Sequence, residues 1–220
     1  MLDEKAHRRT FLATVIAAAG ATVLKPWFSH ERLEAAVRPS TSWDLAWLEQ
    51  LRGKHRQVFE VGKLEDVPGP LHTVANYLDA WRDVYKLEYP EVNTVVSIAG
   101  SGFPINASDA IWAKYKLADK WRLSESGGKQ DATHNVFLTA PASDSKRASV
   151  KGLQERGTVF TQCNNALKAI SRELALASHQ TADKVYEELV AGLNPGVRLV
   201  PANTMLVGLA QEHGCAYEFV

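Results

Sequence analysis

The chain alternates between strand-like and helix-like segments from residue 55 to its end, and this alternation limits the folds open to it. Residues 55–61 alternate apolar and polar side chains, and residues 92–99 form a β-branched run typical of a buried strand. Between them, residues 71–87 place apolar side chains at helical spacing. Parallel strands need such a crossover between them. The order therefore predicts a parallel or mostly parallel sheet with helices on both faces.

The rest of the chain continues this order and brings the expected number of strands to about five. The other predicted elements are a short helix at 43–51, helices at 107–121 and 145–156, a strand at 158–163, a helical stretch at 165–191 that breaks near His179, a strand at 197–202, a helix at 203–213 and a last strand at 215–220. A polar, glycine-rich surface loop is expected at 123–135.

Residues 1–25 have the order of regions found in an export signal. Arg8 and Arg9 precede Phe11-Leu12, and the apolar run that begins there ends before Lys25. Paired arginines with Phe-Leu behind them resemble the twin-arginine (Tat) type of signal peptide. The alternative is an amphipathic helix that contains the arginines by chance. The leader predicts a periplasmic protein that meets the Tat translocase during export.

The leader also sets the expected domain boundaries. Residues 26–54 are expected to form a linker and a short helical arm, and residues 55–220 the folded domain. Small residues at 17–19 and at 35–36 both offer a cleavage site, so its position stays open. An uncut leader would act as a short membrane anchor.

Composition argues against several classes of function. Lys plus Arg and Asp plus Glu number 25 each, so we expect no nucleic-acid partner, which would favour a basic domain. Two cysteines are too few for a disulfide scaffold or a cysteine-only metal site. No histidine pair has the spacing of a helical metal site. We therefore expect no metal and name no cofactor.

Short motifs follow one another in the last third of the chain. A Leu153–Gly157 segment precedes the strand that ends in Cys163, a Leu193–Val197 segment contains an Asn-Pro-Gly turn, and Ala216-Tyr217 lies in the last strand. In this order they resemble the DsrE/DsrF-like family of small sulfur-relay proteins. The resemblance covers residues 150–220 in motif and residues 55–220 in layout. It implies a flavodoxin-like, three-layer α/β domain that assembles as a homo-oligomer.

Cys163 is the candidate catalytic residue. It lies at the carboxyl end of a predicted strand and just before a helix, where ligands bind in open α/β sheets and where a helix N-terminus favours a thiolate. The resemblance implies that such a cysteine carries a persulfide. Asn164 and Asn165 are expected to cap the helix and to donate hydrogen bonds to a bound sulfur.

Two questions about the cysteines stay open at this point. Cys163 is either a reactive thiol or a buried cysteine that packs as a small apolar residue. Cys215 is interpreted as structural, and spacing alone leaves a disulfide between the two undecided.

The glycine turn Gly100-Ser101-Gly102 is the second candidate for ligand binding. It follows a buried strand, and backbone N–H groups in such turns can hold anions. It lacks the dinucleotide and phosphate-loop patterns. Asn106 and Ser108 are expected either to cap the next helix or to contact a ligand, with capping favoured.

The sequence thus predicts an exported DsrE-like protein that carries or binds a small sulfur species through Cys163. Any activity would be of the sulfurtransferase type. One alternative is a non-catalytic, oligomeric binding or scaffold protein of the cell envelope. The other is a small-ligand or metal binder that combines the Gly100 turn with Cys163.

Overall fold

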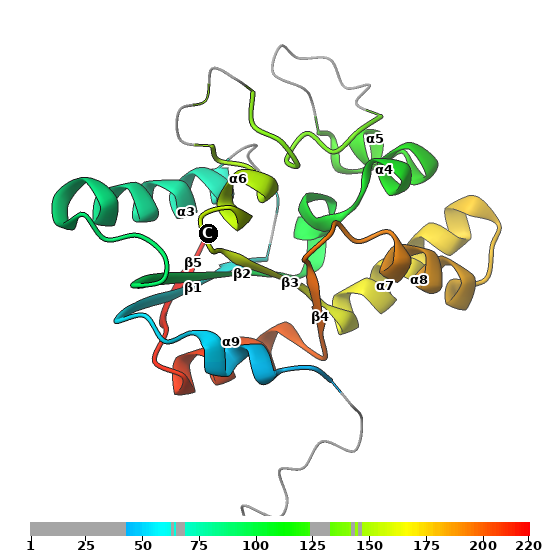
Figure 1. Cartoon of the computed structure of the whole chain (residues 1–220). Helices are drawn as coiled ribbons and strands as arrows, with labels where there is room; N and C mark the ends of the chain where they lie inside the picture. Colours follow the sequence, from blue (N-terminus) through cyan, green and yellow to red (C-terminus); the bar gives the residue numbers. More distant parts are fainter. Residues whose placement is uncertain (1–42, 63, 65–68, 124–132, 142–143, 145–146) are drawn as a thin grey trace, which may run out of the picture. The chain divides into compact units, whose positions relative to one another are not determined.

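Five strands pair side by side in parallel to form one sheet (Figure 1). Their order across the sheet is β4-β3-β2-β1-β5, so the last strand lies beside the first. The bounds are β1 His55–Val61, β2 Val92–Ile98, β3 Val159–Cys163, β4 Arg198–Val200 and β5 Ala216–Phe219. All seven residues of β2 are buried, as its β-branched sequence predicts. The expected α/β class with a parallel sheet of five strands is confirmed.

The structure is a computed structural model that describes residues 43–62, 64, 69–123, 133–141, 144 and 147–220. The predicted leader at 1–25, with Arg8 and Arg9, lies outside these residues, as does most of the predicted arm at 26–54. None of the helices in the described part of the chain is long and apolar enough to cross a bilayer.

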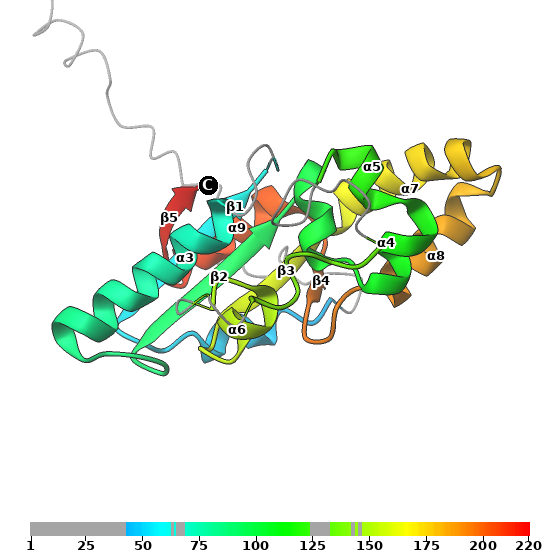
Figure 2. The same ribbon diagram turned by 90° about the horizontal axis from the view of Figure 1, so that it is seen from above.

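Helices cover both faces of the sheet and complete a three-layer arrangement. Helices α3 and α6 lie on one face, and α9 lies on the other (Figure 1). Helices α7 and α8 lie side by side next to β3 and β4 in both views (Figures 1 and 2). The helical bounds are η1 Ala46–Gln50, α3 Gly69–Ala80, η2 Trp81–Tyr85, η3 Gly100–Asn106, α4 Asp109–Tyr115, α5 Leu117–Trp121, α6 Val150–Gln154, α7 Asn164–Ser178, α8 Ala182–Ala191 and α9 Asn203–Glu212.

Several predicted helices are interrupted by single residues in the left-handed conformation. The expected break near His179 is confirmed, because His179 takes φ 54° and ends α7. Lys116, at φ 48°, splits the helix expected at 107–121 into α4 and α5. The helix expected at 71–87 changes at Trp81 into a π-helical turn that Lys86 closes at φ 60°.

Two other predictions about local structure are corrected. The turn expected at residues 100–102 is the start of the 3-10 helix η3, which extends to Asn106. In the region expected to be helical at 145–156, the helix α6 covers only Val150–Gln154, and residues 145–146 are not described.

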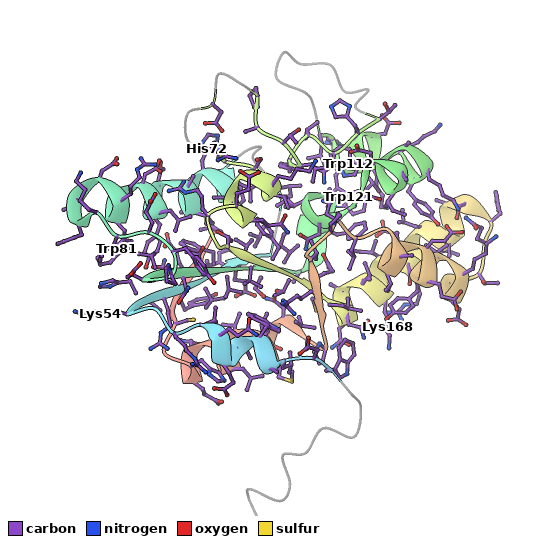
Figure 3. The ribbon with its side chains drawn as sticks, viewed as in Figure 1. Lys54, His72, Trp81, Trp112, Trp121 and Lys168 are labelled. Carbon is purple, nitrogen blue, oxygen red and sulfur yellow. The ribbon has the colours of Figure 1, made fainter. Side chains whose placement is uncertain are left out.

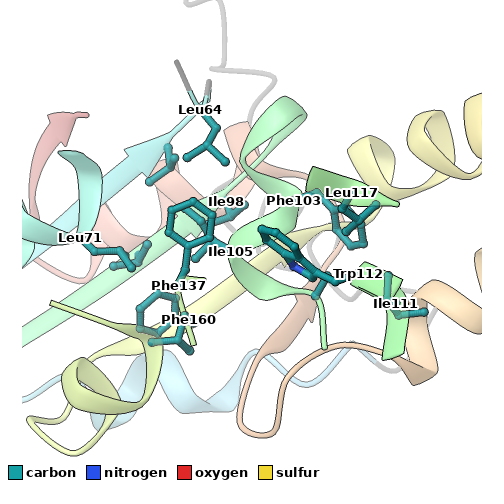
Figure 4. Close-up of a cluster of buried hydrophobic side chains, with 14 of the residues drawn as sticks. Leu64, Leu71, Ile98, Phe103, Ile105, Ile111, Trp112, Leu117, Phe137 and Phe160 are labelled. Carbon is teal, nitrogen blue, oxygen red and sulfur yellow. The ribbon is translucent and has the colours of Figure 1, made fainter. Parts of the chain in front are cut away.

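Successive residues of each strand point to opposite faces, so each face has its own apolar cluster. On the α3 face, Phe59, Ile98 and Phe160 pack with residues of η3 and α4, among them Phe103 and Trp112 (Figure 4). On the α9 face, the neighbouring strand positions supply the apolar residues Val58, Val95 and Val200, which pack with α9 and η1.

The segment that contains η1 belongs to this second cluster. Trp47, Leu48 and Leu51 are buried against Val58 and Val95. The backbone N–H of Gly53 donates to Asn93 Oδ1 at 2.6 Å, which joins the segment to β2. Residues from Trp43 onward are therefore part of the same folded unit as the sheet.

We expect Leu48→Ala to lower the free energy of unfolding by about 2–4 kcal/mol, because it leaves a cavity under the sheet. Leu48 is 2 % exposed, whereas Leu176 on α7 is 81 % exposed. The control Leu176→Ala should change the stability by less than about 0.5 kcal/mol. Urea unfolding of the full chain measures both, and equal values for the two variants would show that η1 does not stabilise the domain.

Candidate functional site

The thiol of Cys163 lies where two helices begin. Cys163 is the last residue of β3 and the N-cap of α7, and its Sγ accepts a hydrogen bond from the backbone N–H of Ala166 at 3.4 Å. A second N–H, from Asn203 at the start of α9, donates to the same Sγ at 3.3 Å. The helices have 15 and 10 residues, and the N-terminus of each carries positive partial charge. This arrangement would stabilise a negative charge on the sulfur.

Cys163 is almost completely buried. The residue is 5 % exposed and belongs to neither of the two apolar clusters of the described residues. Both donors to its sulfur are backbone amides. The hydrogen bonds to the thiol in the described residues therefore come from the backbone at the starts of two helices.

The prediction that Asn164 and Asn165 cap α7 is wrong. The sulfur of Cys163 takes the capping position, because Cys163 itself is the residue that precedes the helix. Asn164 is buried, and its Oδ1 accepts a hydrogen bond from Tyr186 on α8 at 2.7 Å. Asn165 is exposed, and in the described part of the chain neither asparagine donates to Sγ.

The glycine turn at the end of β2 is held against the end of β1. Gly100 takes φ +52°, and a Cβ there would lie 2.7 Å from the carbonyl oxygen of Gly62, so this position requires glycine. Ser101 Oγ accepts from the backbone N–H of Leu64 at 3.1 Å. Gly102 is buried, and a Cβ there would lie 3.1 Å from Ile98. These contacts give the turn a structural role.

Asn106 does not cap α4, because it is the last residue of η3 and Ser108 precedes α4, so the capping expectation for it is wrong. The expectation that it contacts a ligand stays a prediction. Asn106 is fully buried, and its Nδ2 donates to the backbone oxygen of Thr161 at 3.0 Å and to Gln162 Oε1 at 3.1 Å. Ser108 precedes α4, but its side chain makes no capping hydrogen bond.

Gly100 and Ser101 line a hollow of about 420 Å³ at the carboxyl edge of the sheet. Lys120 and Trp121 of α5 form a second wall of the hollow. Helix α7 forms a third wall with residues that include Ala166. Trp121 lies on the same side of the sheet as Trp112 (Figure 3). Cys163 does not line this hollow, so the hollow beside the turn is not formed by the thiol.

A row of polar side chains on the α9 face was missed by the sequence analysis. Glu60, Ser97 and Thr161 are in register across β1, β2 and β3. Thr161 Oγ1 donates to Ser97 Oγ at 3.4 Å, and Ser97 in turn donates to Asn203 Oδ1. Asn203 Nδ2 donates to Glu60 Oε1 at 2.6 Å. The row thus reaches the residue whose backbone N–H contacts Cys163.

Tyr217 of β5 extends this row to the surface. Its hydroxyl donates to Glu60 Oε2 at 2.6 Å, and this hydrogen bond to a carboxylate raises the pKa of Tyr217. The sequence does contain a signal for the row: one polar residue in each of three strands, two positions after a buried or half-buried valine. Without the strand register, however, these residues cannot be aligned.

Cys215 has a different environment from Cys163. It lies in the apolar cluster on the α9 face, and burial raises the pKa of its thiol, while Arg56 opposes this effect. Both cysteines are free thiols, so they form no disulfide. The structural interpretation of Cys215 agrees with these contacts.

Within the described residues, no group of three His, Cys, Asp or Glu side chains is placed to hold a metal ion. The structure therefore offers no described metal centre to combine with the Gly100 turn.

Comparisons with known proteins add a structural similarity and no family. No protein-family model matches the chain, and no curated protein matches it. A solved structure of a protein of unknown function, MTH1491 from Methanobacterium thermoautotrophicum, is similar at a TM-score of 0.40 and 17 % sequence identity. The similarity covers 76 % of this chain and 99 % of that chain.

The two asparagines Asn106 and Asn165 should respond differently to removal of their side chains. Asn106→Ala should lower the free energy of unfolding by about 1–3 kcal/mol, since it leaves buried acceptors without a donor. Asn165→Ala removes an exposed side chain and should change it by less than about 0.5 kcal/mol. Thermal or urea unfolding measures both, and an Asn106→Ala variant as stable as the natural chain would contradict a structural role.

Proposed function

We propose that the chain is an exported protein that carries or binds a small sulfur species through Cys163. One observation carries this proposal: Sγ accepts N–H groups from the first turns of both α7 and α9. The thiolate is the form of a cysteine that reacts, and two such donors can stabilise the charge on a sulfur that reacts in this form. The proposal of export rests on the sequence around Arg8 and Arg9.

Sulfur transfer at this position needs no oxidant or reductant. The Cys163 thiolate attacks the outer sulfur of a persulfide donor, R–S–SH. A new S–S bond forms on Cys163, the S–S bond of the donor breaks, and the donor leaves as the thiolate R–S⁻. The product on the chain is a persulfide, which the two backbone N–H groups can also hold.

The low exposure of Cys163 limits the size of its partner in this reaction. At 5 % exposure, little of the residue is open to a large molecule. This supports a small sulfur species, such as a low-molecular-weight persulfide, as the donor.

The proposal is tested on the two single-cysteine variants, Cys163→Ser and Cys215→Ser. We expect the Cys215→Ser variant, which keeps Cys163, to react with iodoacetamide under native conditions and to take up one sulfur from a persulfide donor. Treatment with cyanide should then release that sulfur as thiocyanate. Mass spectrometry and thiocyanate analysis measure the two steps.

The matched variant Cys163→Ser keeps only Cys215, which is similarly buried but surrounded by apolar side chains. It should react with neither reagent before unfolding. If Cys163 is also unmodified in the native state and yields no thiocyanate, the sulfur-carrying function is excluded and Cys163 is a buried structural residue.

A second candidate is a non-catalytic, oligomeric protein of the cell envelope, and the edge strand β5 favours it. Among the strands that the structure describes, β5 pairs only with β1, and its Tyr217 and Phe219 are 44 % and 60 % exposed. An edge strand offers unpaired backbone groups, and aromatic side chains are common at protein interfaces.

If β5 joins copies of the chain, Phe219→Asp should shift the assembly toward the monomer, because it places a charge in the interface. Leu176→Asp, at another exposed apolar residue, serves as the control and should leave the assembly unchanged. Analytical ultracentrifugation measures the mass. A natural chain that sediments as a monomer would refute an assembly through β5.

A further inference from the structure

The carboxylate of Glu60 occupies an unusual place in the sheet. Glu60 lies in β1, which is paired on both sides, and points to the α9 face, two residues after the fully buried Val58. No basic side chain in the described residues forms an ion pair with it. Its two oxygens accept from Asn203 Nδ2 and from the Tyr217 hydroxyl, both at 2.6 Å. A partly buried carboxylate is costly to keep without such donors.

Asn203 connects this carboxylate to the thiol. Its side chain is held at both ends, with Oδ1 accepting from Ser97 and Nδ2 donating to Glu60. Its backbone N–H donates to Cys163 Sγ. Because side chain and backbone belong to one residue at the start of α9, hydrogen bonds to the amide restrict the movement of its backbone N–H.

We infer that Glu60 is a positioning residue for Cys163, which acts by holding Asn203 so that its backbone N–H points at the sulfur. This inference rests on the proposed function of Cys163. Ser97 attaches the Asn203 amide to the sheet through a neutral hydrogen bond, and Thr161 in turn donates to Ser97. The carboxylate adds a stronger, charge-assisted hydrogen bond to the same amide. Glu60 does not touch the sulfur, so its effect passes through Asn203.

The test measures the rate constant for alkylation of Cys163 by iodoacetamide in the full chain that carries Cys215→Ser. Glu60→Ala should lower this rate constant about tenfold, the effect expected when one hydrogen bond to an anionic sulfur is weakened. Glu60→Gln keeps an oxygen acceptor for Asn203 and should restore the rate constant to within about threefold of its original value.

Glu218 offers a matched control on the neighbouring strand. It accepts a hydrogen bond from Gln57 at 2.5 Å, so it also joins β5 to β1 through a carboxylate, but no hydrogen bond leads from it to Asn203 in the described residues. Glu218→Ala should leave the alkylation rate constant unchanged. Ser97→Ala provides a second test, and it should lower the rate constant in the same direction as Glu60→Ala.

The outcomes separate this inference from the proposed function. If Cys163 is reactive and both Glu60→Ala and Ser97→Ala react at the original rate, the positioning role is refuted and the proposed function stands. If Glu60→Ala and Glu218→Ala slow the reaction equally, the effect is a general loosening of the β1–β5 pair, and the positioning role is again refuted. If Cys163 is unreactive in the unsubstituted background, both proposals fail.

Discussion

The parallel pairing of all five strands is the constraint on which the rest of the structure depends. Parallel strands bring all their carboxyl ends to one edge, and each must be reached by a crossover. Because β4 and β5 lie at opposite edges, the chain between them has to cross one face of the sheet, and α9 makes this crossing against β1 and β2. The crossing starts beside the end of β3. Strand order therefore brings the first turn of α9 to Cys163.

The same alternation of faces explains why a polar row can exist under a buried sheet. Three valines in register pack toward α9, namely Val58, Val95 and Val159. In each strand, the next residue that points to the same face is polar. Each polar group in the row has a partner, which offsets the cost of removing it from water. The row attaches α9 to the sheet at the end where its N-terminus meets the thiol. Stability and the geometry of the site thus depend on the same hydrogen bonds.

Local patterns in the sequence were enough to predict the strands and the position of Cys163, but not its partners. The β-branched run of β2 and the strand that ends in Cys163 are recognisable because burial on both faces selects for such residues. The capping prediction for Asn164 failed because the helix begins at Asn164 and Cys163 is its N-cap, and the Asn164 side chain instead accepts from Tyr186, 22 residues later. The Glu60–Asn203 pair joins residues 143 positions apart, and only the strand register brings them together. Short-range spacing carries no information about such pairs.

Burial alone does not distinguish the two thiols of this chain, since Cys163 and Cys215 are 5 % and 6 % exposed. Their difference lies in what surrounds the sulfur. Cys215 packs among apolar side chains, which disfavour a charged sulfur and raise its pKa. Cys163 instead faces two backbone N–H groups at helix N-termini. A thiol can therefore be nearly inaccessible and still be suited to hold charge, provided that the dipoles around it are fixed before the charge appears.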